Sequence, residues 1–161
     1  MGNGFCHDSR NIKYRRPLGA VPCGTTVTLY FDANTLSLPE SVRLRIWSKA
    51  GGEQLLDPAT IDEKPCCYHY RFVFTVPAEP GLVWYRFLIR HENRSIGYGA
   101  PADGLGGEGV EYGAVPEDDW QITVFEPTAK VPAWYTHGVM YQIFPDRFYR
   151  GDAPAALPEL P

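Results

Sequence analysis

The sequence contains no long apolar run, no block of basic residues and no motif of paired metal ligands. Because a membrane-spanning helix needs about 18 or more consecutive apolar residues, none is predicted, and no membrane partner is expected. The 15 Lys and Arg are outnumbered by 19 Asp and Glu, which gives a net charge of −4. A nucleic-acid partner is not expected either, since that function needs a concentrated basic surface. The opening residues lack the basic and apolar regions that predict a signal peptide.

Residues that carry metal or redox chemistry are few. The four cysteines form no Cys-x-x-Cys motif and the four histidines no pair at ligand spacing, so neither a metal site nor a cofactor is predicted. This pattern favours reduced thiols and a cytoplasmic protein. The Gly-x-Ser-x-Gly motif of one hydrolase class is also missing. The glycine-rich segment 99–113 lacks the Gly-Lys-Ser/Thr ending of a phosphate loop, and we expect a mobile loop there.

What the sequence has instead is proline, glycine and short alternating segments. Its 15 prolines, 16 glycines and 14% aromatic residues suit an all-β domain with many turns. We predict an immunoglobulin-like β-sandwich of about seven to eight antiparallel strands. Alternation of apolar and polar residues predicts the strands at 11–16, 25–33, 41–49, 67–76, 82–91, 95–99 and 120–125. Irregular structure is expected at 1–9, 53–66 and 100–113.

Three large aromatic residues fall on the outward side of this alternation, where polar residues are usual. They are Tyr30, Trp47 and Trp84. Flat rings pack against the C–H faces of sugars, and a neighbouring arginine (Arg45 or Arg86) can bond the hydroxyl groups, so a carbohydrate-binding surface is one interpretation. The second is that another surface covers these rings, since exposed apolar patches usually mark contacts. The third is that single exposed aromatics carry no function.

The segment Val139–Phe144 predicts a buried strand, ended by Pro145 and followed by a polar loop. A buried strand needs neighbouring strands, and the few residues after it cannot supply them. We therefore expect three parts in the chain: a sandwich at 1–126, a linker at 127–138, and the first strand and loop of a truncated second domain at 139–161.

The same segment resembles a known family. "GVMYQIFPDRF" at 138–148 is similar to the first strand of the catalytic (β/α)8 barrel in the alpha-amylase superfamily, glycoside hydrolase family 13. The neopullulanase, cyclomaltodextrinase and maltogenic amylase subgroup is the most similar. Residues 5–126, with "HDSRNIKYRRPLGAVPCGTTVTL" and "WYRFLI", resemble the N-terminal sandwich of those enzymes, which is similar to carbohydrate-binding module family 34.

The resemblance implies a parent enzyme of carbohydrate metabolism that hydrolyses or transfers α-glucans such as cyclodextrin, pullulan and maltooligosaccharides with retention. Its catalytic carboxylates belong to later barrel strands, so this chain alone is expected to be inactive. The implied partners are an α-glucan oligosaccharide, the missing barrel and a second copy in a homodimer. The implied roles are substrate shaping, dimer contact or weak glucan binding; a dedicated starch-binding module and a purely structural interaction domain are the alternatives.

The family often binds calcium after the first barrel strand, through Asn and Asp side chains around a Gly-Asp pair. Gly151 and Asp152 match that pair, but Arg150 stands where the family commonly has Asn. The residues that follow, 153–156, offer no side-chain oxygen. The resemblance therefore implies calcium for the parent family, and we do not expect this chain to bind it.

Overall fold

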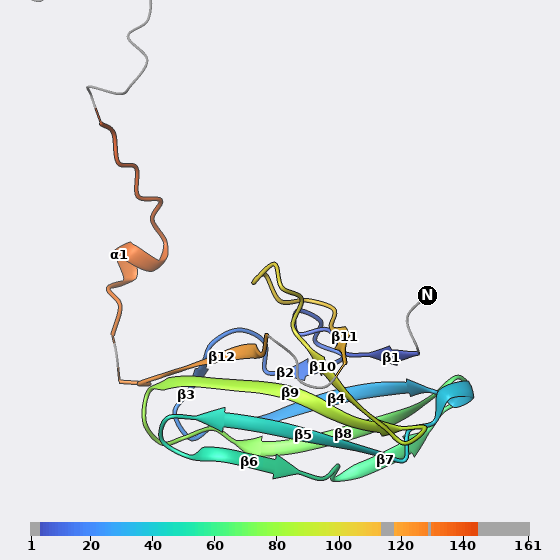
Figure 1. Ribbon diagram of the computed structural model, residues 1–161. Coiled ribbons are helices and arrows are strands. Elements are labelled where there is room, and N and C mark those ends of the chain that lie inside the picture. The colour runs from blue at the N-terminus through green and yellow to red at the C-terminus, as the bar shows by residue number, and fades with distance from the viewer. Residues whose placement is uncertain (1–3, 114–117, 129, 145–161) are drawn as a thin grey trace, which may run out of the picture. The chain divides into compact units, whose positions relative to one another are not determined.

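The computed structural model describes residues 4–113, 118–128 and 130–144 of the 161-residue chain. The chain divides into two compact units, Met1–Ala129 and Lys130–Pro161. Within the described residues the first unit consists of two β-sheets and a single 3-10 turn, η1 (Thr35–Ser37) (Figure 1). The predicted all-β fold is therefore confirmed.

The first sheet is built on two nine-residue strands, β4 (Thr26–Asn34) and β8 (Cys67–Thr75), which pair in antiparallel register along their whole length. The short strand β7 (Thr60–Glu63) extends the sheet beyond β8. Two further short strands, β1 (Phe5–Cys6) and β2 (Arg15–Arg16), pair with the opposite edge of β4, one at each end. The N-terminal segment thus forms an edge of this sheet.

The second sheet is built on the 11-residue strand β9 (Gly81–His91). On one side β9 pairs with β5 (Ser41–Ser48), and β6 (Gly52–Leu56) continues from β5. The other side of β9 is shared by two strands, β10 (Arg94–Gly99) and β12 (Trp120–Phe125). The sheet ends in β11 (Val110–Tyr112) beside β10 and in β3 (Val21–Pro22), which pairs with β12 in parallel.

The core lies between the inward faces of the two sheets, as the alternation predicts. On β9 the residues at 83, 85, 87 and 89 are buried, and on β4 those at 27, 29, 31 and 33 are fully buried. Aromatic rings fill the centre; Phe31 and Phe87 lie 4.8 Å apart between ring centroids. Full burial of each such side chain stabilises the fold by roughly 1.5–3 kcal/mol, which makes this double layer the main source of stability.

The structure has twelve strands within the described residues, not the seven or eight expected. The segment 53–66, predicted to be a loop, contains most of β6 and all of β7. Both are edge strands whose residues are almost all exposed, so burial imposes no alternation on their sequence. The short strands β1, β3 and β11 were also not predicted, because two or three residues are too few to show a period.

The N-terminal segment differs most from its prediction. Residues 1–9 were expected to be loose, yet β1 joins the first sheet and His7 is fully buried. The strand predicted at 11–16 is a turn, with the Tyr14 amide donating to the Asn11 carbonyl at 2.8 Å, and only β2 is extended. Tertiary contacts of His7 and its neighbours override the local pattern here.

His7 is held in the core by two hydrogen bonds. Its Nδ1 lies 2.7 Å from the Tyr30 carbonyl oxygen, which can only accept, so Nδ1 donates. In the neutral ring Nε2 is then the acceptor, and the Tyr85 hydroxyl lies 3.1 Å from it. Burial lowers the pKa of His7 from 6.5 to about 4, partly offset by the bond to the Tyr30 carbonyl. His7 is therefore neutral at physiological pH.

In the second unit, the described residues form one short helix, α1 (Ala133–Thr136), and a segment without regular secondary structure. In the described part of the chain, Val139–Phe144 pairs with no strand, and Val139 and Tyr141 are 88% and 85% exposed. A strand forms only where another backbone satisfies its polar groups, so the assignment of this segment to the first strand of a truncated barrel stays a prediction. The residues of the calcium comparison, 150–156, lie outside the described residues.

Gly109 packs directly against the core, and substitution with alanine is expected to destabilise the protein. A Cβ there would lie 2.3 Å from Tyr98 Cε1 and 2.7 Å from Trp120 Cη2, so two buried rings would have to move. We expect Gly109→Ala to lower the free energy of unfolding by about 1–3 kcal/mol in urea denaturation. Gly113→Ala is the matched control, because a Cβ there meets nothing within 4 Å. Equal stability of the two variants would contradict the packing described.

The buried neutral His7 predicts a pH dependence of stability. In the unfolded chain the histidine binds a proton below its ordinary pKa of 6.5, whereas in the folded chain it does so only near 4. As pH falls from 6.5 to 4, protonation of this histidine in the unfolded state lowers the free energy of unfolding by about 1.4 kcal/mol per pH unit. His7→Gln should flatten that part of the pH–stability curve, measured by urea denaturation. The exposed His137→Gln should leave the slope unchanged; an unaltered slope in both variants contradicts the assignment.

Candidate functional site

Two tryptophans lie side by side on the outward face of the second sheet. Trp47 of β5 and Trp84 of β9 are directly opposite each other in the antiparallel register. Their ring centroids are 5.2 Å apart with planes tilted by 51°, and Trp47 is 37% exposed. They meet here because each lies between two inward residues of its strand, so the pleat turns both rings outward. The structure thus brings together two of the three aromatic residues predicted as site residues.

A cluster of charges lies beside the tryptophans, two residues further along the same strands. Arg45 and Arg86 are directly opposite each other, an arrangement that is unfavourable for like charges alone. Asp119 lies between them: Arg45 Nη1 donates to its Oδ2 at 2.9 Å, and Arg86 Nε is 3.2 Å from its Oδ1. Glu53 also accepts from Arg45 Nη2 at 2.9 Å. Burial raises the pKa of Asp119, and the two guanidinium groups partly offset this.

A depression of about 550 Å³ borders the tryptophan pair at the end of β5 and the start of β9. Its walls come from the β5–β6 turn and the β8–β9 turn, and both tryptophans contribute to its lining. A second hollow of about 300 Å³ shares Trp47 and both turns. The pair therefore lies at the rim of a concave surface large enough for a small ligand.

Together these groups can bind a ligand that is apolar on one face and polar at its edge. The rings supply flat apolar area, and the adjacent arginines and carboxylates supply donors and acceptors. Ring-shaped sugars have this character, since their C–H faces pack on aromatic rings and their hydroxyls hydrogen-bond. Among the described residues no cluster of three or more His, Cys, Asp or Glu could hold a metal ion.

Tyr30, the third predicted site residue, does not join the tryptophans. It lies on β4 of the first sheet, whereas Trp47 and Trp84 belong to the second. Its ring stacks on His69 at a centroid distance of 4.7 Å and an interplanar angle of 15°. The central carbon of the Arg16 guanidinium lies over the same ring, 5.6 Å from its centroid. Tyr30 is thus part of a separate cluster on the other sheet.

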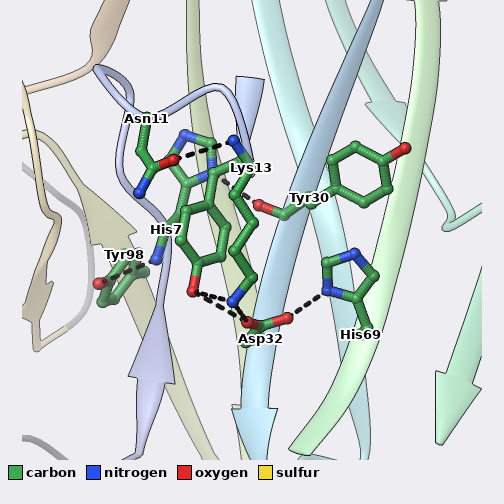
Figure 2. A network of polar contacts seen from close by, with 8 residues as sticks. His7, Asn11, Lys13, Tyr30, Asp32, His69 and Tyr98 are labelled. Atoms are coloured by element: carbon green, nitrogen blue, oxygen red, sulfur yellow. Dashed lines mark hydrogen bonds and ion pairs between the residues drawn. The ribbon is translucent and has the colours of Figure 1, made fainter. Parts of the chain in front are cut away.

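That cluster is centred on the buried carboxylate of Asp32 (Figure 2). Lys13 Nζ and the Tyr14 hydroxyl each donate to Asp32 Oδ2 at 2.9 Å, and His69 Nδ1 bonds Oδ1. Burial by itself would raise the pKa of Asp32, but the bonds from His69, Lys13 and Tyr14 outweigh it and the pKa is lowered. The carboxylate is therefore ionised and joins the N-terminal segment to the first sheet.

No pattern in the sequence predicted this cluster. Asp32 and His69 lie 37 positions apart in sequence and meet only because β4 and β8 pair with these two residues opposite each other. Because three donors satisfy the carboxylate and it is only 6% exposed, we interpret the cluster as structural.

No helix within the described ranges is long and apolar enough to cross a membrane.

Comparison with known proteins found amylopullulanases among the relatives of this chain. The chain is 36% identical over 148 residues to an amylopullulanase of Thermoanaerobacterium thermosulfurigenes, a match that covers 91% of this chain and 8% of the relative. An amylopullulanase of Thermoanaerobacterium saccharolyticum is also 36% identical, with 91% and 11% covered. The chain thus spans about a tenth of the length of these relatives. No protein-family model matches it.

A solved structure of a cyclomaltodextrinase has the same fold. It aligns with a TM-score of 0.55 and 18% sequence identity, covering 92% of this chain and 24% of the other. At that identity the likeness concerns the fold alone. It agrees with the β-sandwich built from the two sheets described above.

Removal of the Asp32 carboxylate tests the structural interpretation. Because the folded-state pKa lies below the ordinary 3.8, the stabilisation is fully present above about pH 4 and is lost as pH falls through the lower folded value. We expect Asp32→Asn to cost about 3 kcal/mol at pH 7 and to show less acid dependence below pH 4 than the natural protein. The exposed Asp57→Asn should cost no more than about 0.5 kcal/mol. Denaturant unfolding at several pH values measures both; equal costs contradict the interpretation.

Proposed function

We propose that the chain belongs to the alpha-amylase superfamily, glycoside hydrolase family 13, and that its β-sandwich is a non-catalytic, glucan-binding part of such an enzyme. The parent enzyme would act on α-glucans such as pullulan, cyclodextrins or maltooligosaccharides. The sandwich would hold a stretch of the glucan and present it to catalytic carboxylates located elsewhere in the enzyme. The name of these relatives, amylopullulanase, supports α-glucans as the substrate class.

The observation that carries this proposal is the tryptophan pair on the outer face of the second sheet. Trp47 and Trp84 are adjacent, partly exposed and at the rim of a depression of about 550 Å³. The charged groups beside them supply hydrogen-bonding partners on the same face. Tyr30 is left out of this site, because its ring is stacked on His69 in the other sheet.

A second candidate function is contact with another copy of the chain. The same face also exposes the apolar side chains of Leu55 and Leu82, at 47% and 36%. Leu55 lies opposite Arg45 on β6, and Leu82 lies two residues before Trp84 on β9, so apolar side chains border both the charged groups and the tryptophans. A homodimer that buries this face would exclude sugar from it, and the two functions are therefore separable by experiment.

Titration with sugar tests the proposed function. We expect maltoheptaose and β-cyclodextrin to change tryptophan fluorescence, and Trp47→Ala and Trp84→Ala each to weaken binding at least about tenfold, which corresponds to about 1.4 kcal/mol. Trp134→Ala, in the second unit, and Tyr30→Leu, in the other sheet, should leave the affinity unchanged. Sedimentation velocity of the same samples reports any dimer.

The outcomes separate the candidates. Absence of binding up to millimolar sugar, together with a dimer that Trp47→Ala dissociates, favours the contact between copies. Sugar binding that both tryptophan variants retain in full refutes this face as the glucan site.

A further inference from the structure

A pocket of about 620 Å³ opens at the edge of the sandwich, where β2 of the first sheet approaches β12 of the second. The N-terminal segment, the loop around 100–106 and the first residues of β12 line it. Arg15 forms part of its wall from β2, and Asp118, Asp119 and Gln121 from β12 and the residues before it. Of these groups only Asp119 also belongs to the charge cluster beside the tryptophans.

Arg15 is the unusual group in this pocket. Its side chain is 7% exposed, and within the described residues it forms no ion pair. Its two terminal nitrogens donate to backbone oxygens, Nη2 to Gly19 at 2.6 Å and Nη1 to Gln121 at 3.3 Å. Its Nε is buried, and the guanidinium lies close enough to the Tyr85 hydroxyl to lower that group's pKa against the effect of burial. A buried charge without an ion-pair partner is costly, and hydroxyl oxygens of a ligand in the pocket would compensate part of that cost.

The edge pocket adjoins the tryptophan face. Gln121 lies directly opposite Trp84 in the pairing of β12 with β9, and it is exposed on the same side of the sheet. Asp119 lines the pocket and also bonds Arg45 and Arg86 beside the tryptophans. Since neighbouring strands are about 4.8 Å apart, a ligand on β5 and β9 reaches this pocket by crossing one further strand.

The charges in the pocket favour a neutral ligand rich in hydroxyl groups. Arg15 and Arg10 supply donors, and the carboxylates of Asp118 and Asp119 supply acceptors to the same space. An anion would meet two carboxylates there, and a cation two guanidinium groups. A sugar hydroxyl both donates and accepts, so adjacent hydroxyls can use groups of both kinds at once.

We propose that the edge pocket is a further subsite for the glucan, which extends from the Trp47–Trp84 pair across Gln121 to the buried Arg15. The inference rests on the proposed function, because the tryptophans hold the first part of the same ligand. It names a length requirement: a long linear glucan contacts both places, whereas a disaccharide on the tryptophans does not reach Arg15.

Calorimetric titration of the chain with maltose and with linear maltoheptaose tests this requirement. Gln121→Ala and Asp118→Asn should each weaken maltoheptaose binding about three- to tenfold, as the loss of one net hydrogen bond predicts, and leave maltose binding unchanged. Both residues lie at or near the surface, so the variants are expected to fold. Asp62→Asn, an exposed carboxylate on β7 of the other sheet, is the matched control and should bind both sugars normally.

A direct readout comes from the Arg15 side chain by nitrogen–proton NMR, with its Nε–H signal assigned by its loss in Arg15→Lys. We expect maltoheptaose to shift this signal, and maltose not to shift it. If inorganic phosphate shifts it and maltoheptaose does not, the pocket is an anion site and the inference is overturned. If Arg15→Lys fails to fold, the Gln121→Ala and Asp118→Asn titrations decide alone.

The two proposals fail in different ways. If the natural chain binds neither sugar, the proposed function falls and this inference with it. If maltoheptaose binds and Trp47→Ala weakens it, but Gln121→Ala and Asp118→Asn bind like the natural protein, only the extension into the edge pocket is wrong.

Discussion

Strand β9 is the element on which the rest of the structure depends. It bonds β5 along one side and both β10 and β12 along the other, so it connects the two halves of the second sheet. Its inward residues, among them Tyr85 and Phe87, fill the centre of the core. Its outward residues Trp84 and Arg86 supply half of the candidate site. Because one rigid strand carries both sets, the position of the site is set by the packing of the core.

Charge compensation decides what this outer face can do. The pairing of β5 with β9 places Arg45 opposite Arg86, and the two cations would repel each other without Asp119. Asp119 directly precedes β12, so the segment that leads into the third strand completes a charge cluster that the first two leave unbalanced. The arginines are thereby held at fixed positions beside the tryptophans, and their orientation is available to a ligand without further ordering.

The N-terminal segment closes the other side of the molecule by a different means. It has too few residues in extended conformation to form a stable sheet edge by backbone bonds alone. Instead His7 enters the core as a neutral ring, and Lys13 and Tyr14 bond the buried Asp32. Arg15 follows from the same segment and is held by backbone oxygens at the sandwich edge. In this segment polar side chains therefore provide the tertiary contacts that inward apolar side chains provide in the long strands.

The sequence by itself determined the all-β class, the inward and outward faces of the long strands and the outward position of Trp47 and Trp84, because a period of two follows directly from backbone geometry. Only the tertiary structure decided which residues meet. The pairing of β5 with β9 joined the two tryptophans and left Tyr30 on the other sheet, and the pairing of β4 with β8 brought Asp32 to His69. Contacts between segments distant in sequence decide which strands pair, and the local alternation of residues carries no information about those contacts. The segment Val139–Phe144 shows the same limit, since its apolar pattern is that of a strand, yet a strand exists only where a second backbone bonds it.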